Sequence, residues 1–271
     1  MTKGRGICVG ILGALAFVVL GVRANYAAEL DCLMEPKVTV AVSFSVEGLL
    51  ETVTVDRGDL VEEGQVLATL ESSVEKAMVA VAHARTQMEA AIKAGNVRVD
   101  FGGRKLARQE EGFQGGGISF GEVDEAATAK ALAEVAVQEA TENKRLAETE
   151  MQRAVAELAV RTVRSPITGV VTERLLSPGE FTKQSPVLKV AQLDPLRIEV
   201  IVPVAQLGKI SVGMPAEIIP EAPLNSVHQA RVTVVDRVVD AASGTFGVRL
   251  ELPNPGYRLA AGLKCKVRFP R

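Results

Sequence analysis

The chain has 271 residues, of which 47% are hydrophobic and only 4% aromatic, and it contains no Trp. This composition supplies a core but favours long helices and small β modules over a single enzyme domain with a bulky core. The formal net charge of −2 falls to −5 when residues 1–24, which hold three basic residues and no acidic one, are left out, and such an acidic chain is not expected to bind nucleic acid.

The N-terminus is predicted to be an export signal. Lys3 and Arg5 precede the apolar run from Ile7 to Val22, which ends at a small-residue cleavage site. The run is short for a membrane-spanning helix, although an uncleaved membrane anchor stays open as an alternative. Residues 1–24 are therefore interpreted as signal peptide or anchor, and residues 25–37 as a lead-in segment.

Two short β units flank a long helical segment and align at a fixed offset of 121 residues without a gap. The matched positions are Gly48 with Gly169, Gly58 with Gly179, and Val66-Leu67 with Val187-Leu188. Each half is a strand pair with glycine turns and is too small to bury a core alone. Residues 38–73 and 163–195 are therefore expected to clasp into one lipoyl-like sandwich, so that the inserted residues leave and re-enter at adjacent points.

The inserted residues, 74–162, have helical periodicity and predict an antiparallel hairpin with its tip at about 112–119. One apolar stripe runs along the first arm and is expected to form the seam of a coiled coil. Its members are Val74, Met78, Val81, Met88, Ile92, Val99, Leu106 and Phe113. Gly95, Gly102 and Gly103 predict bending or fraying in the outer part of this arm. Ser119, with Glu122 three residues later, predicts a capping box at the start of the return arm.

The last segment, residues 196–271, holds about four to six short strands with Gly and Pro turns, which favours a small closed β-barrel. The predicted fold is thus α+β and elongated, with a split lipoyl-like β-sandwich, an inserted antiparallel α-helical hairpin and a following β-barrel. In an exported protein Cys32 and Cys265 form an even pair, so a disulfide between them is predicted. Two separate buried thiols are the alternative.

The order of these parts resembles the periplasmic adaptor family, the membrane fusion proteins of haemolysin-secretion type. The motifs that carry the resemblance are Glu47-Gly48, Gly58-Asp59, Gly64-Gln-Val-Leu67, Arg164-Ser-Pro-Ile-Thr-Gly-Val-Val171 and Leu259-Ala-Ala-Gly262. The resemblance implies a homo-oligomeric ring in the periplasm, associated with the inner membrane, that joins an inner-membrane transporter to an outer-membrane channel. An RND-type efflux transporter is the leading interpretation, and an adaptor for an ABC-type exporter or secretion system is the alternative.

Efflux adaptors of this family often carry at the hairpin tip an Arg, a Leu four residues later and a Ser seven residues beyond, which contact the channel. Arg108, Gly112 and Ser119 occupy these positions here, and the Gly departs from the pattern. Phe113 and Ile118 are the neighbouring apolar candidates for the missing contact. The alternative interpretation is that Arg108 is a solvated helix charge and Ser119 only a helix cap.

A function from another class, a lipoyl or biotinyl carrier, would need a modifiable Lys in the turn between the two halves. Lys76 lies there in sequence, but about 85 residues separate the halves, which disfavours a carrier. His83 and His228 have no metal-ligand or triad companion at a useful spacing. We therefore predict no enzyme activity, no cofactor and no metal.

Overall fold

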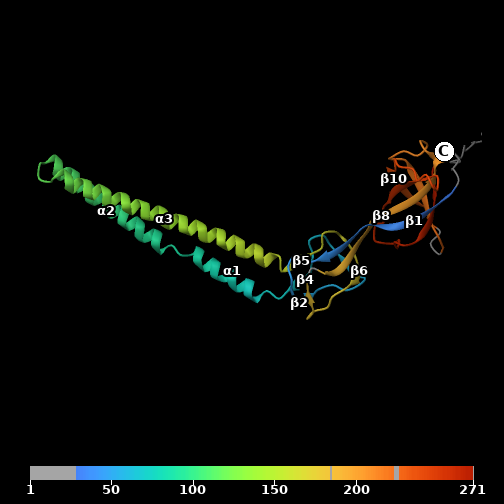
Figure 1. Cartoon of the computed structure of the whole chain (residues 1–271), viewed down its shortest axis with the longest axis horizontal. Helices are drawn as coiled ribbons and strands as arrows, with labels where there is room; N and C mark the ends of the chain where they lie inside the picture. Colours follow the sequence, from blue (N-terminus) through green and yellow to red (C-terminus); the bar gives the residue numbers. More distant parts are fainter. Residues whose placement is uncertain (1–28, 184, 223–225, 271) are drawn as a thin grey trace, which may run out of the picture. The chain divides into compact units, whose positions relative to one another are not determined.

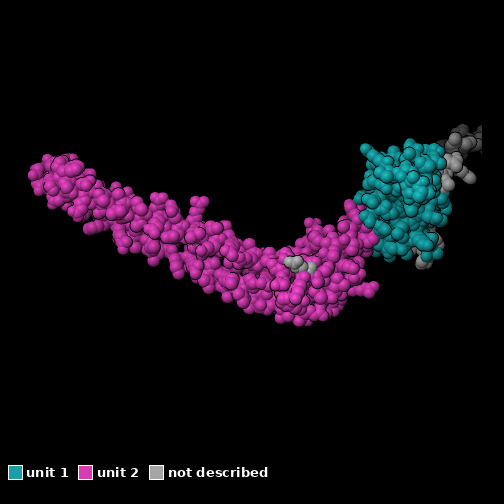
Figure 2. All heavy atoms as spheres, in the orientation of Figure 1, with its two compact units in different colours: residues 1–35, 196–271 teal, residues 36–195 magenta. Residues whose placement is uncertain are grey.

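The structure is a computed structural model that describes residues 29–183, 185–222 and 226–270. The chain divides into two compact units, one with the residues up to 35 and from 196 onward, and the other with residues 36–195 (Figure 2). The predicted signal peptide or anchor, residues 1–24, lies outside the described residues. Among the residues that are described, no helix is both long and apolar enough to cross a bilayer.

The sandwich lies in the unit of residues 36–195 and is built from strands of both halves. Its strands are β1 (Leu30–Ser43), β2 (Gly48–Val53), β3 (Leu60–Val61), β4 (Val66–Leu70), β5 (Thr162–Arg164), β6 (Gly169–Arg174), β7 (Phe181–Thr182) and β8 (Pro186–Pro203), of which β1 and β8 continue into the other unit. Strands of one half pair with strands of the other: β2 with β7, β3 with β6 and β4 with β5. The halves therefore share one core, in which Leu67 and Leu188 are fully buried.

The internal repeat of the sequence corresponds to reciprocal hydrogen bonds between the halves. The amide of Gly58 donates to the carbonyl of Val171 at 2.8 Å, and the amide of Gly179, 121 residues later, donates to the carbonyl of Leu50, also at 2.8 Å. Gly58 and Gly179 have φ angles of +96° and +89°, a region that residues with a Cβ rarely adopt. The two glycines thus shape equivalent turns in a sandwich with approximate two-fold symmetry.

The helical hairpin joins β4 to β5, and these two strands pair directly, with Ala68 opposite Val163. Three helices make it up: α1 (Ser73–Thr86), α2 (Ala90–Gln114) and the single return helix α3 (Phe120–Ala159). In Figure 1 the first arm is broken between α1 and α2, whereas α3 continues past the break. The predicted exit and re-entry of the insertion at adjacent points is confirmed.

The expected seam of the hairpin was wrong in its details. Most of the large residues of the predicted stripe are exposed, from 46% for Phe113 to 69% for Met88. The buried positions of the hairpin are small: Ala82, Thr86, Gly95, Gly102, Ala126 and Ala154. Small side chains let the two arms approach closely, and the larger ones are left at the margins of the contact.

The expected fraying of the outer arm at its glycines was also wrong, because α2 is one unbroken helix from Ala90 to Gln114. A Cβ on Gly95 would lie 2.6 Å from Cγ2 of Val137, and one on Gly102 would lie 3.2 Å from Cα of Lys130. These glycines therefore allow close contact between α2 and α3, and the helix stays regular through both. The break falls earlier, at residues 87–89, where the sequence has neither Gly nor Pro.

The other unit is a six-stranded β-barrel. Its strands follow the order β1, β12 (Lys264–Arg268), β9 (Pro215–Pro220), β10 (His228–Val235), β11 (Thr245–Leu252) and β8, and a β1–β8 pairing closes it. A short 3-10 helix, η1 (Val204–Gln206), follows β8. The inward positions of β8, from Leu196 to Val202, are at most 1% exposed. The predicted α+β fold, with its split sandwich, inserted hairpin and barrel, is confirmed.

The segment expected to be a lead-in, residues 25–37, contributes a barrel strand from Leu30 onward. Cys32 and Met34 point into the barrel core, and the period-two pattern that they form is too short to stand out in the sequence. Cys32 lies opposite Cys265 of β12, and the two are joined by a disulfide across 233 positions of sequence. The disulfide therefore fastens the first described strand of the chain to the last one.

Candidate interaction sites

The hairpin tip is a tight turn made by three consecutive glycines. The amide of Gly116 donates to the carbonyl of Phe113 at 3.0 Å, and the amide of Gly117 donates to that of Gly112, also at 3.0 Å. Gly116 has a φ of +73°, so a side chain at this position would strain the turn. The turn ends α2 and directs the chain back into α3 within a few residues.

Two apolar contacts hold this turn together. A Cβ on Gly112 would lie 2.4 Å from Cδ1 of Ile118, so the half-buried Ile118 side chain occupies the space beside Gly112. The rings of Phe113 and Phe120 meet edge to face with their centroids 6.2 Å apart. Phe113 and Phe120 remain 46% and 69% exposed, so the tip presents an aromatic pair to solvent.

Ser119 is the N-cap of α3 and forms a capping box with Glu122. The Glu122 carboxylate accepts hydrogen bonds from the Ser119 amide at 2.9 Å and from the Ser119 hydroxyl at 2.8 Å. These two bonds favour the charged carboxylate, so the pKa of Glu122 lies below its ordinary value. The capping role predicted for Ser119 is thus present in the structure.

Of the five residues predicted at the tip, the structure brings four into the turn. Gly112 contacts Ile118, Phe113 packs against Phe120, and Ser119 caps α3. Arg108 lies one turn before Gly112 on α2, is exposed, and makes no ion pair with any described residue. The sequence reasoning missed Phe120 as part of this surface, although its place directly after the cap could have pointed to it.

The base of the hairpin is held by Arg161, which follows α3. Its guanidinium lies 2.6 Å from the Glu75 carboxylate in the first turn of α1 and donates to the carbonyl of Glu47 at 3.2 Å. The Arg161 and Glu75 side chains are only 25% and 15% exposed. Three segments that are far apart in sequence thus meet at one cation.

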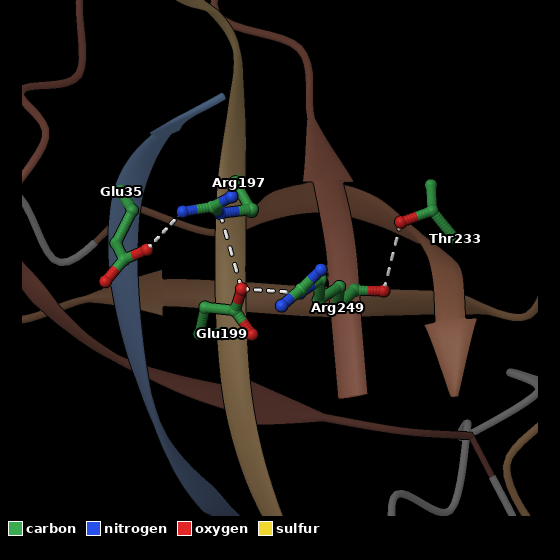
Figure 3. Close-up of polar contacts among 5 residues, drawn as sticks. All are labelled: Glu35, Arg197, Glu199, Thr233 and Arg249. Atoms are coloured by element: carbon green, nitrogen blue, oxygen red, sulfur yellow. Dashed lines mark hydrogen bonds and ion pairs between the residues drawn. The ribbon is translucent and has the colours of Figure 1, made fainter. Parts of the chain in front are cut away.

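The barrel carries a chain of charges on its outer face (Figure 3). Glu35 of β1 lies 2.8 Å from Arg197 of β8, and Glu199 lies 3.3 Å from Arg197 and 2.7 Å from Arg249 of β11. The Arg197 Nε is buried and too poorly aligned with Glu199 for a hydrogen bond, so that contact is purely Coulombic. The first of these pairs crosses the β1–β8 closure of the barrel, and sequence inspection gave no means of finding it.

The comparisons with known proteins agree with this architecture. The CzcB-like barrel-sandwich hybrid domain matches residues 38–192, more than half of the chain, and the CusB-like β-barrel domain matches residues 196–271. The chain belongs to the membrane fusion protein family. The resemblance that the sequence motifs suggested is confirmed.

Individual relatives of this membrane fusion protein are distant. The pyoverdine export membrane fusion protein PvdR of Pseudomonas aeruginosa is 29% identical over 188 residues, which make up 68% of this chain and 48% of PvdR. MacA from Actinobacillus actinomycetemcomitans has a similar fold, with a TM-score of 0.75 at 20% identity, covering 90% of this chain and 78% of MacA. Spr0693 from Streptococcus pneumoniae R6 superposes with a TM-score of 0.62 at 16% identity, over 89% and 97% of the two chains. The chain spans about half the length of the curated relatives it matches.

The residues considered for carrier or metal chemistry in this membrane fusion protein have ordinary surroundings. The amide of Lys76 donates to the carbonyl of Ser72, which places Lys76 in the first turn of α1 and not in a sandwich turn. His83 lies on α1, and His228 lies 2.7 Å from the Ser226 hydroxyl. Within the described ranges no three His, Cys, Asp or Glu residues are grouped to hold a metal ion.

Proposed function

We propose that this membrane fusion protein is a periplasmic adaptor of a tripartite efflux system, associated with the inner membrane. In this role it bridges an inner-membrane transporter and an outer-membrane channel, and several copies form a ring. The observation that carries the proposal is the helical hairpin inserted between the paired strands β4 and β5, with exposed aromatic rings at its tip. The export role printed in the name of PvdR supports it.

The hairpin gives the adaptor its reach. The 40 residues of α3 extend about 60 Å at about 1.5 Å per residue. Weak contacts at each tip add up when copies are linked in a ring, because every contact after the first is made at high effective concentration. The CusB-like β-barrel domain that matches residues 196–271 is a β-barrel of RND type. This match favours an RND transporter as the inner-membrane partner.

Deletion of residues 74–161, with the ends joined by a short turn, tests the bridging role and leaves β5 complete. Because β4 and β5 pair directly, the sandwich should still fold, which circular dichroism and thermal unfolding can check. Cross-linking to the channel and efflux in cells should both be lost. The role would be refuted by efflux that survives the deletion. Identification of the inner-membrane protein recovered after cross-linking separates an RND transporter from one with nucleotide-binding domains.

Arg108→Glu tests whether the exposed cation near the tip contacts the channel. We expect weaker channel cross-linking and lower drug tolerance, with unchanged thermal stability because Arg108 pairs with no described residue. Arg104→Glu, one turn earlier on the same helix and also exposed, is the matched control. Equal effects of the two substitutions would mean that the general charge of α2 matters and that Arg108 has no special contact.

A further inference from the structure

Two connections between strands meet at one end of the barrel. Residues 204–214 link β8 to β9, and residues 236–244 link β10 to β11. Because Pro203 lies opposite Thr245, the first connection leaves β8 at the level where the second one enters β11. The amide of Val204 also donates to the carbonyl of Gly244 at 2.9 Å, so the connections touch. We call the surface made by these two connections the loop end of the barrel.

The loop end exposes several aliphatic side chains. β8 and β9 are not neighbours in the barrel, so the first connection crosses from one to the other, and its one buried residue is Ile210. The large aliphatic residues of the two connections that face solvent are 46–81% exposed: Val204, Leu207, Val212 and Val238. The connection of residues 253–263, at the opposite end of the barrel, exposes no large hydrophobic side chain. Aliphatic exposure of this kind marks an interaction surface.

The chain also enters and leaves the barrel at the loop end. Glu29, Pro203 and Thr245 line one hollow, so the start of β1 is level with the end of β8. Leu30 lies opposite Val267, which places the end of β12 there as well. The segment predicted to be a signal peptide or membrane anchor, residues 1–24, is therefore connected to the barrel at its loop end.

The charges of the loop end suit an anionic surface. Lys209 and Arg237 are exposed and make no ion pair with any described residue. The acids of the two connections are drawn away from the surface. Asp240 accepts a hydrogen bond from the Ala242 amide at 2.8 Å within its own turn, and the Asp236 carboxylate lies over β11, where a Cβ on Gly247 would overlap it. The cations thus remain available to a partner.

Protruding aliphatic side chains with cations beside them match the boundary between the headgroups and acyl chains of a bilayer. The aliphatic groups gain by leaving water, and each Lys or Arg is attracted to anionic lipid. A protein partner would need a surface of complementary shape, whereas lipid adapts to residues that project from separate loops. Of the two kinds of partner, the membrane therefore fits the loop end better.

We propose that the loop end docks on an anionic phospholipid bilayer, with Leu207 and Val238 inserted below the headgroups and Lys209 and Arg237 level with the phosphates. The assignment rests on the proposed association with the inner membrane and names a surface that makes it. It implies that the barrel itself contacts lipid, in addition to any contact made by residues 1–24.

The first test places a fluorescent reporter at single cysteines in the full chain. Leu207→Cys and Val238→Cys label the loop end, and Arg258→Cys, exposed in the connection at the opposite end, is the control. Cys8→Ser removes the other cysteine outside the disulfide. In vesicles of phosphatidylethanolamine and phosphatidylglycerol, brominated acyl chains should quench the reporters at 207 and 238 but not the one at 258. Absence of quenching at the loop end, or equal quenching at all three positions, overturns the proposal.

The second test places a charge among the aliphatic residues. With the reporter at Leu207→Cys, Val238→Glu should lower the ratio of docked to undocked protein about tenfold, as expected when one aliphatic side chain no longer leaves water. Val227→Glu is the matched control, because Val227 is 55% exposed and lies at the opposite end of the barrel. Thermal unfolding checks that both variants keep their fold. Equal effects of the two substitutions contradict docking through the loop end.

The third test varies the lipid charge. Lys209→Glu should weaken docking about fivefold on vesicles that contain phosphatidylglycerol, because a cation near an anionic surface contributes about 1 kcal/mol. On vesicles of phosphatidylcholine alone the substitution should have little effect. Equal weakening on both kinds of vesicle would show that Lys209 does not face the phosphates and would overturn its assignment.

Docking and the bridging role fail separately. Deletion of residues 74–161 removes the hairpin and should abolish efflux while leaving the quenching at the loop end unchanged. If the reporters are shielded only when an inner-membrane transporter is present, the loop end binds protein, and the docking proposal fails while the adaptor role stands. If quenching is observed and efflux survives the deletion, docking is correct and the adaptor role is refuted.

Discussion

Arg161 illustrates how a single side chain joins an insertion to its host domain. Its guanidinium satisfies the Glu75 carboxylate and the Glu47 carbonyl at once. Gly48 leaves room for this guanidinium, because a Cβ at position 48 would lie 2.9 Å from the Arg161 Nη1. The position of this Arg at the end of α3 gave no signal in the sequence, since its partners come from segments far away along the chain.

Arg161→Ala should lower the free energy of unfolding by about 1–3 kcal/mol, because it leaves a largely buried carboxylate without its charged donor. Urea denaturation followed by circular dichroism measures the change. Arg174→Ala is the control, since Arg174 lies 3.4 Å from a mostly exposed Asp56. An exposed pair of this kind contributes about 0–1 kcal/mol. Equal losses in the two variants would show that the Arg161–Glu75 contact stabilises the protein no more than an exposed ion pair does.

The capping box at Ser119 makes the stability of the tip depend on pH. The lowered pKa of Glu122 means that its stabilising effect is complete above the ordinary value of 4.5 and is lost as the pH falls through the lower folded value. Hydrogen exchange at residues 119–123 should therefore be slower in the wild type than in Glu122→Gln near neutral pH. The difference should vanish in acid, whereas Glu111→Gln should match the wild type throughout. A difference that persists in acid contradicts this role for the carboxylate.

At the scale of elements, the hairpin shows how far helical periodicity in a sequence can be trusted. The period predicted two antiparallel arms correctly, because any amphipathic helix produces it. It could not show which face of each arm meets the other, because small residues and large apolar residues both fit a seam. Gly95 and Gly102 were interpreted as weak points, yet both lie in close contact with α3.

Alanine substitutions at two adjacent glycines of α2, Gly102 and Gly103, distinguish the effect of helix propensity on stability from the effect of packing against α3. Gly103→Ala should stabilise the hairpin by about 0.5–1 kcal/mol, because nothing lies within 4 Å of the added Cβ. Gly102→Ala has the same gain in propensity, but its Cβ would lie 3.2 Å from Cα of Lys130, so the variant should be less stable than Gly103→Ala. Thermal unfolding at 222 nm compares them. Equal midpoints would mean that the arms can separate without loss of stability.

At the scale of the whole molecule, the sequence was most informative where it repeats itself. The 121-residue offset predicted the clasped sandwich, and the reciprocal bonds of Gly58 and Gly179 are its physical basis. The barrel was predicted as a class, but its first strand was assigned to a lead-in. That strand contributes few residues to the barrel and is separated from its β12 partner by most of the chain, so only long-range pairing identifies it.

The disulfide between Cys32 and Cys265 should stabilise the barrel by about 2–5 kcal/mol, mainly by restricting the unfolded chain. We expect peptide mapping without reductant to recover the two cysteines in one linked peptide. The double variant Cys32→Ser and Cys265→Ser should unfold at a lower urea concentration than the oxidised protein and should not respond to reductant. Two separate free-thiol peptides would contradict the pairing.

This cross-link also has a topological consequence. Because it joins residues 233 positions apart, the sandwich and the whole hairpin lie within one covalent circle. A protease that cuts once at the glycine turn of the tip would open the circle without dividing the molecule. The nicked protein should run as one band on a non-reducing gel and as two fragments after reduction. A single cut at the hairpin tip would thus leave the protein as one covalently connected molecule.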